Sequence, residues 1–139
     1  LHSKSEVVIG IYANASSLSG KLAFLLTPSH MPVSICSSSS KMGHSLSFGN
    51  CNLATIFAKD AALADAAATL ACNSVKHLKD VNPVLESVVS ISGVSGALII
   101  KDEHIGLAGD LPKLVKIADS RLANKITVDR NSTHTICLS

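Results

Sequence analysis

Two oxygen-bearing side chains, Asp65 and Thr69, lie four residues apart in the segment DAALADAAATLACN, which begins at Asp60. Asp is a favoured N-cap residue and alanine has the highest helix propensity, so the segment predicts a helix after Asp60. Residues four apart on a helix project from the same side, about one turn from each other. A carboxylate and a hydroxyl are hard oxygen ligands of the kind that Mg²⁺ takes. The alternative is an exposed Asp beside a Thr bonded to a carbonyl of its own helix, and the spacing leaves both open.

A second candidate site is the polar segment SSSSKMGHS, residues 37–45, which follows a predicted strand. Small hydroxyl residues, a Lys and a Gly can surround a phosphate with backbone N–H groups and hydroxyls. A His in such a segment can act as a phosphate ligand or a proton donor. A flexible polar loop is the alternative meaning of a serine run. The residues predicted to bind a phosphate-containing cofactor are Ser38, Ser39, Ser40, Lys41, Gly43 and His44.

The cysteines give a third candidate, Cys36 as a nucleophile at the end of a strand. Lys41 would lower the pKa of this thiol if its side chain folds back nearby. No base is assigned to Cys36, and a buried structural thiol is the alternative. The chain has no C-x-x-C pair, so neither a zinc knuckle nor a dithiol redox motif is present. Reduced thiols in a cytoplasmic protein are the expectation.

Composition limits the classes of function. With 139 residues, 47% of them apolar, the chain is about one domain with a real core. It has no Trp, one Tyr and three Phe, so base stacking on aromatic rings has few rings to use. A net charge of +2 without a run of Lys or Arg argues against a nucleic-acid partner. No apolar run approaches the ~18 residues that span a bilayer, and Leu1–Ser5 lacks the apolar core of a secretory signal, so no membrane partner and a cytoplasmic location are predicted.

The elements that would position these residues are strands, two adjacent helices and further strands. The second helix is predicted to start with Asn82 as its cap and Pro83 in its first turn. A hairpin is predicted to turn near Asp102. The expected strands cover residues 6–13, 21–27, 33–36, 53–58, 96–101, 103–108 and 113–118. This order predicts an α+β fold, an antiparallel or mixed sheet with two adjacent helices packed on one face. Residues 1–118 would form the domain, and residues 119–139 a polar tail or an edge element.

Two long motifs resemble an uncharacterised family of the ApbE-like (flavin-transferase-like) superfamily, found mainly in archaea and anaerobic bacteria. Cys36–Gly49 (CSSSSKMGHSLSFG) is similar to that family's C-T-S-S-G-T-V-G-H-S-L-S-F-G motif. Asp60–Thr69 (DAALADAAAT) matches its second motif almost letter for letter. Shorter similarities lie at Ile9–Ala13, Leu18–Leu22 and Gly106–Leu111. The resemblance implies the carboxyl-terminal half of an ApbE-like (T-fold-like) domain.

The resemblance also implies cofactors. Flavin transferases of the superfamily cleave FAD and attach FMN to a Thr of a target protein, with magnesium held partly by the Asp and Thr of a D-A-L-S-T motif. Asp65 and Thr69 keep both ligand types at that spacing. The resemblance therefore implies Mg²⁺ and FAD or FMN. The transferases' H-x-x-D-P motif is absent, because residues 44–48 are HSLSF, and whether the chain is an enzyme stays open.

Two functions follow as expectations. One is binding of a flavin or other phosphate-containing ligand with magnesium. The other is a non-catalytic interaction or assembly module in a metabolic system of the sulfur-assimilation type. Chains of the resembled family carry an amino-terminal half with a G-G-D-type segment that helps to form the site, and no such segment precedes Glu6. An open sheet edge and an uncovered apolar face favour association, so a homo-oligomer or a complex with a separate amino-terminal fragment is expected.

Overall fold

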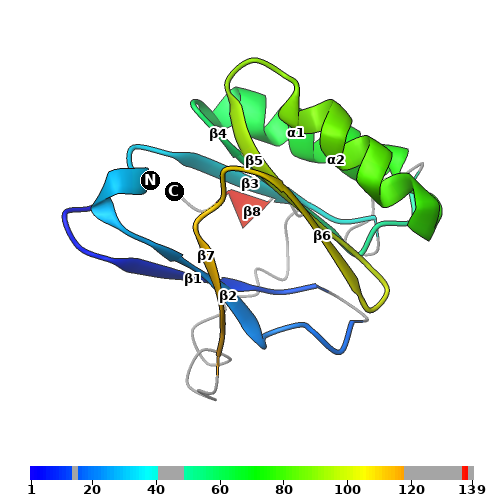
Figure 1. Ribbon diagram of the computed structural model, residues 1–139, viewed down its shortest axis with the longest axis horizontal. Helices are drawn as coiled ribbons and strands as arrows, with labels where there is room; N and C mark the ends of the chain where they lie inside the picture. The colour runs from blue at the N-terminus through cyan, green and yellow to red at the C-terminus, as the bar shows by residue number, and fades with distance from the viewer. Residues whose placement is uncertain (14–15, 41–48, 118–135, 138–139) are drawn as a thin grey trace.

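The computed structural model describes residues 1–13, 16–40, 49–117 and 136–137. They form three layers: two helices, a five-stranded antiparallel sheet and a three-stranded antiparallel sheet (Figure 1). The strands are β1 (Val7–Ile11), β2 (Leu22–Leu26), β3 (Ser34–Ser38), β4 (Leu53–Ala58), β5 (Val94–Lys101), β6 (His104–Gly109), β7 (Lys113–Lys116) and β8 (Ile136–Cys137). The helices are α1 (Ala61–Ser74) and α2 (Val81–Val89), with short 3₁₀ turns η1 (Pro28–His30) and η2 (Leu78–Asp80).

The five-stranded sheet forms the middle layer, in the order β6-β5-β4-β3-β8. Its strand β4 is buried along its whole length, since the helices cover one face and the smaller sheet covers the other. Side chains alternate between the faces of a strand, so Ala54 and Ile56 join the core under the helices. Leu53 and Phe57 join the core between the two sheets. The sheet therefore separates two apolar cores.

The three-stranded sheet has the order β1-β2-β7 and packs on the face of the large sheet opposite the helices. Its central strand β2 sends Leu22, Phe24 and Leu26 into the core between the sheets. The Phe24 ring meets Phe57 of β4 edge to face, with ring centroids 4.8 Å apart. Such a pair is favourable beyond the apolar area that it buries. This contact fixes the small sheet on the large one.

Helix α1 packs closely because the side chains under it are small. Asp60 is its N-cap, and the carboxylate accepts a hydrogen bond from the Leu63 N–H at 2.8 Å. The side facing the sheet consists of Ala64, Ala67, Ala68, Ala71 and Cys72, all buried. Alanines keep the distance between helix and sheet short, so α1 lies against β3 and β4. The predicted helix after Asp60 is confirmed.

Helix α2 begins one residue before the predicted cap, so the prediction of Asn82 as the cap is wrong. The helix starts at Val81, directly after η2. Asp80 is the reason: its carboxylate accepts hydrogen bonds from the N–H groups of Lys76 and His77, at 3.1 and 2.8 Å, and organises the turn before the helix. These bonds also lower the pKa of the Asp80 carboxyl. Pro83 is tolerated because the first four N–H groups of a helix have no partner within it.

The α+β class with two helices on one face of a sheet is confirmed, as is the hairpin at Asp102, whose φ of 55° makes the turn. The structure adds the second sheet, which the order of elements does not reveal. Residues 118–135 and 138–139 lie outside the described residues, so the boundary at residue 118 stays a prediction. Among the described residues, no helix has the length and apolar character needed to cross a membrane.

Candidate functional site

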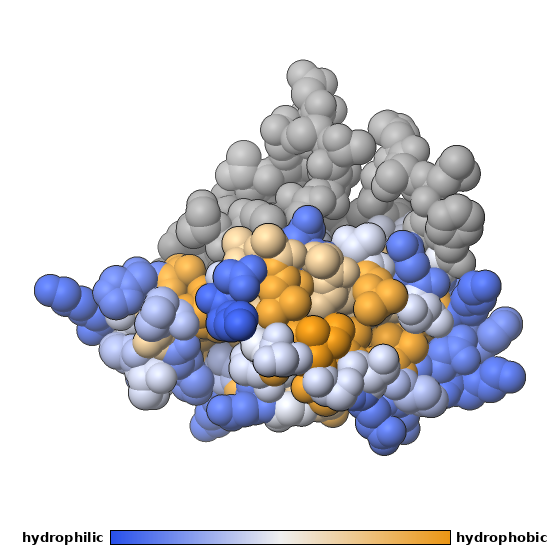
Figure 2. All heavy atoms as spheres, turned by 90° about the horizontal axis from the view of Figure 1, so that it is seen from above, coloured by the Kyte–Doolittle hydropathy of each residue, from blue (hydrophilic) through white to orange (hydrophobic). Residues whose placement is uncertain are grey.

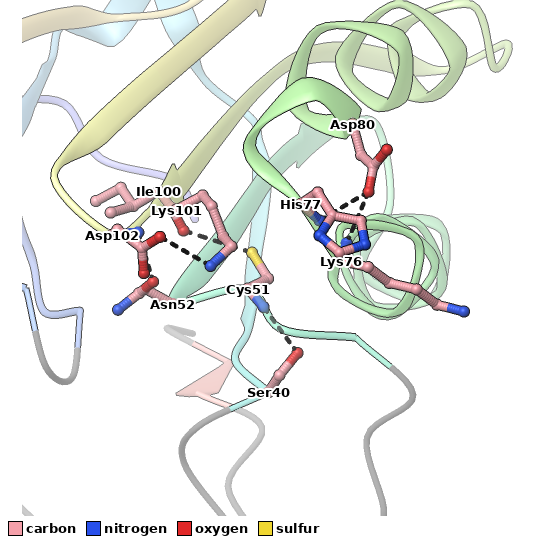
Figure 3. Close-up of polar contacts among 9 residues, drawn as sticks. All are labelled: Ser40, Cys51, Asn52, Lys76, His77, Asp80, Ile100, Lys101 and Asp102. Carbon is pink, nitrogen blue, oxygen red and sulfur yellow. Dashed lines mark hydrogen bonds and ion pairs between the residues drawn. The ribbon is translucent and has the colours of Figure 1, made fainter.

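The serine segment leaves the large sheet at the end of β3. Ser37 hydrogen-bonds through its hydroxyl to Thr55 on β4, at 2.7 Å. Ser40 is held on both its backbone and its side chain, because its N–H donates to the Cys51 carbonyl at 3.0 Å and its Oγ accepts from the Cys51 N–H at 3.2 Å (Figure 3). The predicted ligands Lys41, Gly43 and His44 fall in residues 41–48, outside the described residues.

Ser40 also ties this segment to the last turns of α1. Its Oγ lies 3.0 Å from the Cys72 sulfur and 3.5 Å from the Cys72 carbonyl oxygen. At the other end of the contact, the Cys36 thiol donates to the Ala61 carbonyl at 3.8 Å. The first turn of α1 therefore contacts Cys36, and its last turns contact Ser40. Helix and strand run side by side in the same direction, toward the serine segment.

Asp65 and Thr69 lie on the part of α1 between these two contacts. Asp65 precedes Cys72 by seven residues and Thr69 precedes it by three, so both project from the side of the helix that carries Cys72. At about 1.5 Å per residue, Asp65 is about 10 Å from Cys72 along the helix axis, and Thr69 is nearer. Asp65 is half-buried and Thr69 is exposed. The column Asp65–Thr69–Cys72 thus leads along α1 to Ser40.

Two thiols meet at the end of this column. Cys51 and Cys72 are buried and hydrogen-bonded to each other. The hydrogen bond from the Cys51 thiol, helped by those from Ser40 and Ser38, lowers the pKa of Cys72 to about 6. The same contact with Cys72, together with burial, raises the pKa of Cys51. Of the two, Cys72 is the one that ionises near neutral pH.

A buried cation lies next to the thiols. Lys101, at the end of β5, is 5% exposed and forms an ion pair with Asp102 at 2.9 Å. Asn52 is fully buried, and its side-chain oxygen accepts the Asp102 N–H at 2.7 Å. Figure 3 shows Lys101 beside Cys51, and its positive charge favours a thiolate at Cys51. Lys101, Asp102 and Asn52 thus form a cluster of polar residues at the end of the sheet where the serine segment begins.

Cys51, Asn52, Cys72 and Lys101 were not predicted from the sequence as site residues. Ser40 meets Cys72 across 32 residues of chain, so no local motif marks the contact. One signal was present: Lys101 ends the otherwise apolar strand GALIIK. A Lys buried at the end of an apolar strand is rare unless it is paired.

In the described part of the chain, the predicted metal ligands Asp65 and Thr69 do not belong to a larger cluster of metal-binding side chains. Within residues 1–13, 16–40, 49–117 and 136–137, no group of three or more His, Cys, Asp or Glu side chains could hold a metal. Mg²⁺ is usually held by one or two carboxylates with water and phosphate completing its shell, so the pair of Asp65 and Thr69 fits this ion and does not fit a closed structural zinc site.

A cavity of about 160 Å³ lies at the opposite end of β4 and β5. It is lined by Ser29, His30, Val33, Phe57, Ser95, Asp110 and Pro112. The imidazole Nδ1 of His30 accepts the Thr27 N–H at 3.0 Å, which leaves the proton on Nε2. None of the residues predicted from sequence lines this cavity, and it is separate from the serine segment.

Comparison with known proteins shows the family. A sequence model of the family described as AbpE bacteria matches residues 1–100. The UPF0280 protein of Methanocaldococcus jannaschii is 36% identical over 127 residues, covering 88% of this chain and 52% of that protein. The UPF0280 proteins of Methanoculleus marisnigri and of Methanococcus maripaludis C5 are 43% and 42% identical, covering 88% and 84% of this chain and 49% of each of those proteins. The chain spans about half the length of the curated relatives that it matches.

These findings correct one expectation. The predicted place in the ApbE-like flavin-transferase superfamily is wrong, because the matching relatives are UPF0280 proteins and the matching model is that of AbpE bacteria. Among the described residues of the two segments that carried the resemblance, Cys36 and Ser40 contact α1, and the buried alanines of α1 face the sheet. The chain belongs to the family described as AbpE bacteria and resembles the archaeal UPF0280 proteins.

Proposed function

We propose that this chain forms part of a binding site for a small phosphate-containing ligand and Mg²⁺, along the side of α1 that leads to Ser40. The observation that carries the proposal is the column of Asp65, Thr69 and Cys72, with Cys72 in contact with Ser40. Asp65 is half-buried on this side, and a carboxylate is seldom buried without a partner or a ligand. The ligand would lie between α1 and the serine segment.

The proposed roles follow from the chemistry of the side chains. Asp65 would supply negative charge to Mg²⁺ and Thr69 an oxygen, while water and the ligand's phosphate complete the shell. Ser39, with Lys41, Gly43 and His44, would bind the phosphate, and Ser38 would share its hydroxyl between the phosphate and Cys72. Ser40 has a different role, because its hydroxyl is committed to Cys51 and Cys72 and holds the segment against α1. FMN and FAD are the flavin ligands to test, alongside inorganic pyrophosphate.

A second candidate function is an assembly module, and the solvent side of α1 favours it. Ala62, Ala66 and Leu70 form one exposed row on this helix, and Leu70 is 50% exposed. Asp65 is the one charged residue within α1. Seen from the helix side, the molecule gathers apolar surface at its centre with hydrophilic residues around it (Figure 2). A helix without a charged outer face is typical of a buried helix, so another chain would cover it.

Calorimetry tests the ligand site. Titration of Mg²⁺ into the protein with FMN, FAD or pyrophosphate should give binding that EDTA abolishes. Asp65→Asn removes the metal's charged ligand, and we expect it to weaken binding by about 1–3 kcal/mol. The matched control is Asp110→Asn, which changes an exposed Asp at the other end of the sheet and should leave binding unchanged.

The proposal fails if binding of the phosphate compounds is the same with Mg²⁺ and with EDTA. It also fails if Asp65→Asn and Asp110→Asn bind equally well. Binding of Mg²⁺ alone that disappears in Asp65→Asn would support the metal position even if none of these phosphate compounds is the natural ligand.

A further inference from the structure

The chain brings Cys51 and Cys72 together although 20 residues separate them in the sequence. Cys51 lies just before β4 and Cys72 lies in the last turns of α1, two elements that pack on each other. The Ser40 hydroxyl contacts both residues, at 3.2 Å from the Cys51 nitrogen and 3.0 Å from the Cys72 sulfur. The two thiols also lie close enough for each to shift the pKa of the other. The pair is therefore preorganised by the fold and not by a local motif.

We propose that Cys51 and Cys72 are a redox-active pair, which forms a disulfide when the protein is exposed to a peroxide. This site goes beyond the ligand site proposed above and does not depend on it. Cys51 and Cys72 are too far apart in the sequence to form a C-x-x-C motif, so the spacing of the cysteines does not reveal this pair. The proposal assigns the attacking role to Cys72 and the resolving role to Cys51.

The environment favours this division of roles. Ser40 accepts the Cys51 N–H, and its hydroxyl proton can be donated to the Cys72 sulfur at 3.0 Å, which lies nearer than the Cys72 carbonyl oxygen at 3.5 Å. Hydrogen bonds to sulfur stabilise the thiolate, which is the nucleophile. The Cys51 sulfur also lies 3.6 Å from the Ile100 carbonyl oxygen, and an acceptor at that position favours the protonated thiol. Lys101 acts on Cys51, where its positive charge favours the thiolate that attacks in the resolving step.

The reaction balances with hydrogen peroxide as the oxidant. The Cys72 thiolate attacks one peroxide oxygen, which gives a sulfenic acid on Cys72 and releases hydroxide. The Cys51 sulfur then attacks the Cys72 sulfur, forms the S–S bond and displaces the sulfenic oxygen as water. The two thiols lose two electrons and two protons, and the peroxide becomes two molecules of water. A small-molecule thiol reverses the reaction by exchange.

Peptide mapping tests the proposal directly. The reduced protein is exposed to hydrogen peroxide, free thiols are blocked with N-ethylmaleimide, and the protein is digested with trypsin. Cleavage after Lys41, Lys59 and Lys76 places Cys51 in residues 42–59 and Cys72 in residues 60–76. Mass spectrometry should detect these two peptides joined, two hydrogens lighter than their sum, and separated again by reductant.

Variants separate the two roles. In Cys51→Ser, the sulfenic acid on Cys72 has no resolving thiol, so dimedone should trap it. In Cys72→Ser, Cys51 should remain a thiol that N-ethylmaleimide labels after denaturation. Cys36→Ser is the matched control, because it also replaces a buried thiol beside α1 and should leave the joined peptides unchanged. Circular dichroism of each variant verifies that it is folded.

Three results would overturn the proposal. One is full maleimide labelling of both Cys51 and Cys72 after peroxide. Another is a joined pair of other cysteines, such as Cys36 with Cys137, in place of Cys51 with Cys72. The third is equal formation of the Cys51–Cys72 link when the protein is oxidised in urea, since the link would then not depend on the fold.

Discussion

Ser40 shows how one small side chain can hold three segments together. Its hydroxyl contacts Cys51 before β4 and Cys72 in α1, while its own backbone belongs to the serine segment. A buried backbone N–H such as that of Cys51 needs an acceptor, and the Ser40 oxygen supplies it. The hydroxyl predicted to bind phosphate is therefore used by the fold. The neighbouring serines remain the proposed ligands.

The ionisation of Cys72 gives a testable prediction at the same scale. Because its pKa is lowered to about 6, ultraviolet absorbance of the thiolate should rise near that pH in the native protein. The rise should be absent in Cys72→Ser and present in Cys36→Ser. A native protein whose thiolate absorbance appears only near pH 9, the ordinary range of the thiol, would contradict the prediction.

The same shift links stability to pH. The folded protein releases the Cys72 proton near pH 6, whereas the unfolded chain holds it until about pH 9. The unfolded state therefore binds more protons between these values, and the free energy of unfolding should rise with pH across this window. This contribution is lost as the pH falls through 6. Urea unfolding of the wild type and Cys72→Ser at several pH values would measure the difference.

At the scale of elements, the close approach of α2 to β6 depends on a glycine, Gly106, which has no side chain. A Cβ at Gly106 would lie 2.6 Å from side-chain carbons of both Leu85 and Val81 on α2. Those two residues are part of the buried core under the helices. The glycine therefore lets the helix lie close to the outer part of the sheet.

We predict that Gly106→Val destabilises the fold by about 1–3 kcal/mol, the usual effect of overfilling a packed core. The extra methyl groups would push Leu85 and Val81 outward. Leu107→Ala is the control, because the adjacent side chain is 48% exposed and its truncation should change stability by less than about 0.5 kcal/mol. Equal urea midpoints for wild type and Gly106→Val would show that α2 adapts without loss.

The elements also show which parts of the structure a sequence can predict. Asp60 as the N-cap and the turn at Asp102 depend on residues close in sequence, and both were predicted. The start of α2 was missed because the Asp80 carboxylate organises the preceding turn more strongly than Asn82 can cap the helix. The assignment of β7 to the smaller sheet depends on pairing with β2, far away in the chain.

The candidate site divides in the same way. The i, i+4 spacing of Asp65 and Thr69 is local, and their shared side of α1 follows from it. The contact of Cys72 with Ser40 and Cys51 exists only after α1 has packed on β3 and β4. A sequence pattern does not reveal that residues so far apart in the chain lie close together in the fold.

For the whole molecule, the exposed row Ala62, Ala66 and Leu70 predicts association. In sedimentation at micromolar concentration, we expect the chain to form a homo-oligomer larger than its own 14.4 kDa. Leu70→Glu places a charge in the row and should shift the species toward monomer. Leu107→Glu, an equally exposed Leu on β6, is the control. A wild-type monomer that unfolds cooperatively would contradict this prediction.

The pairing of β2 with β7 sets an order of events in folding. Leu22 of β2 pairs with Lys116 of β7, so the small sheet cannot be completed until the chain has been synthesised as far as β7. The β5–β6 hairpin and the β1–β2 pair close over shorter connections, and short loops close at a smaller entropic cost. These two pairs would therefore form early, while β2 keeps one unpaired edge until β7 arrives. During synthesis, that open edge of β2 must wait until β7 has been made.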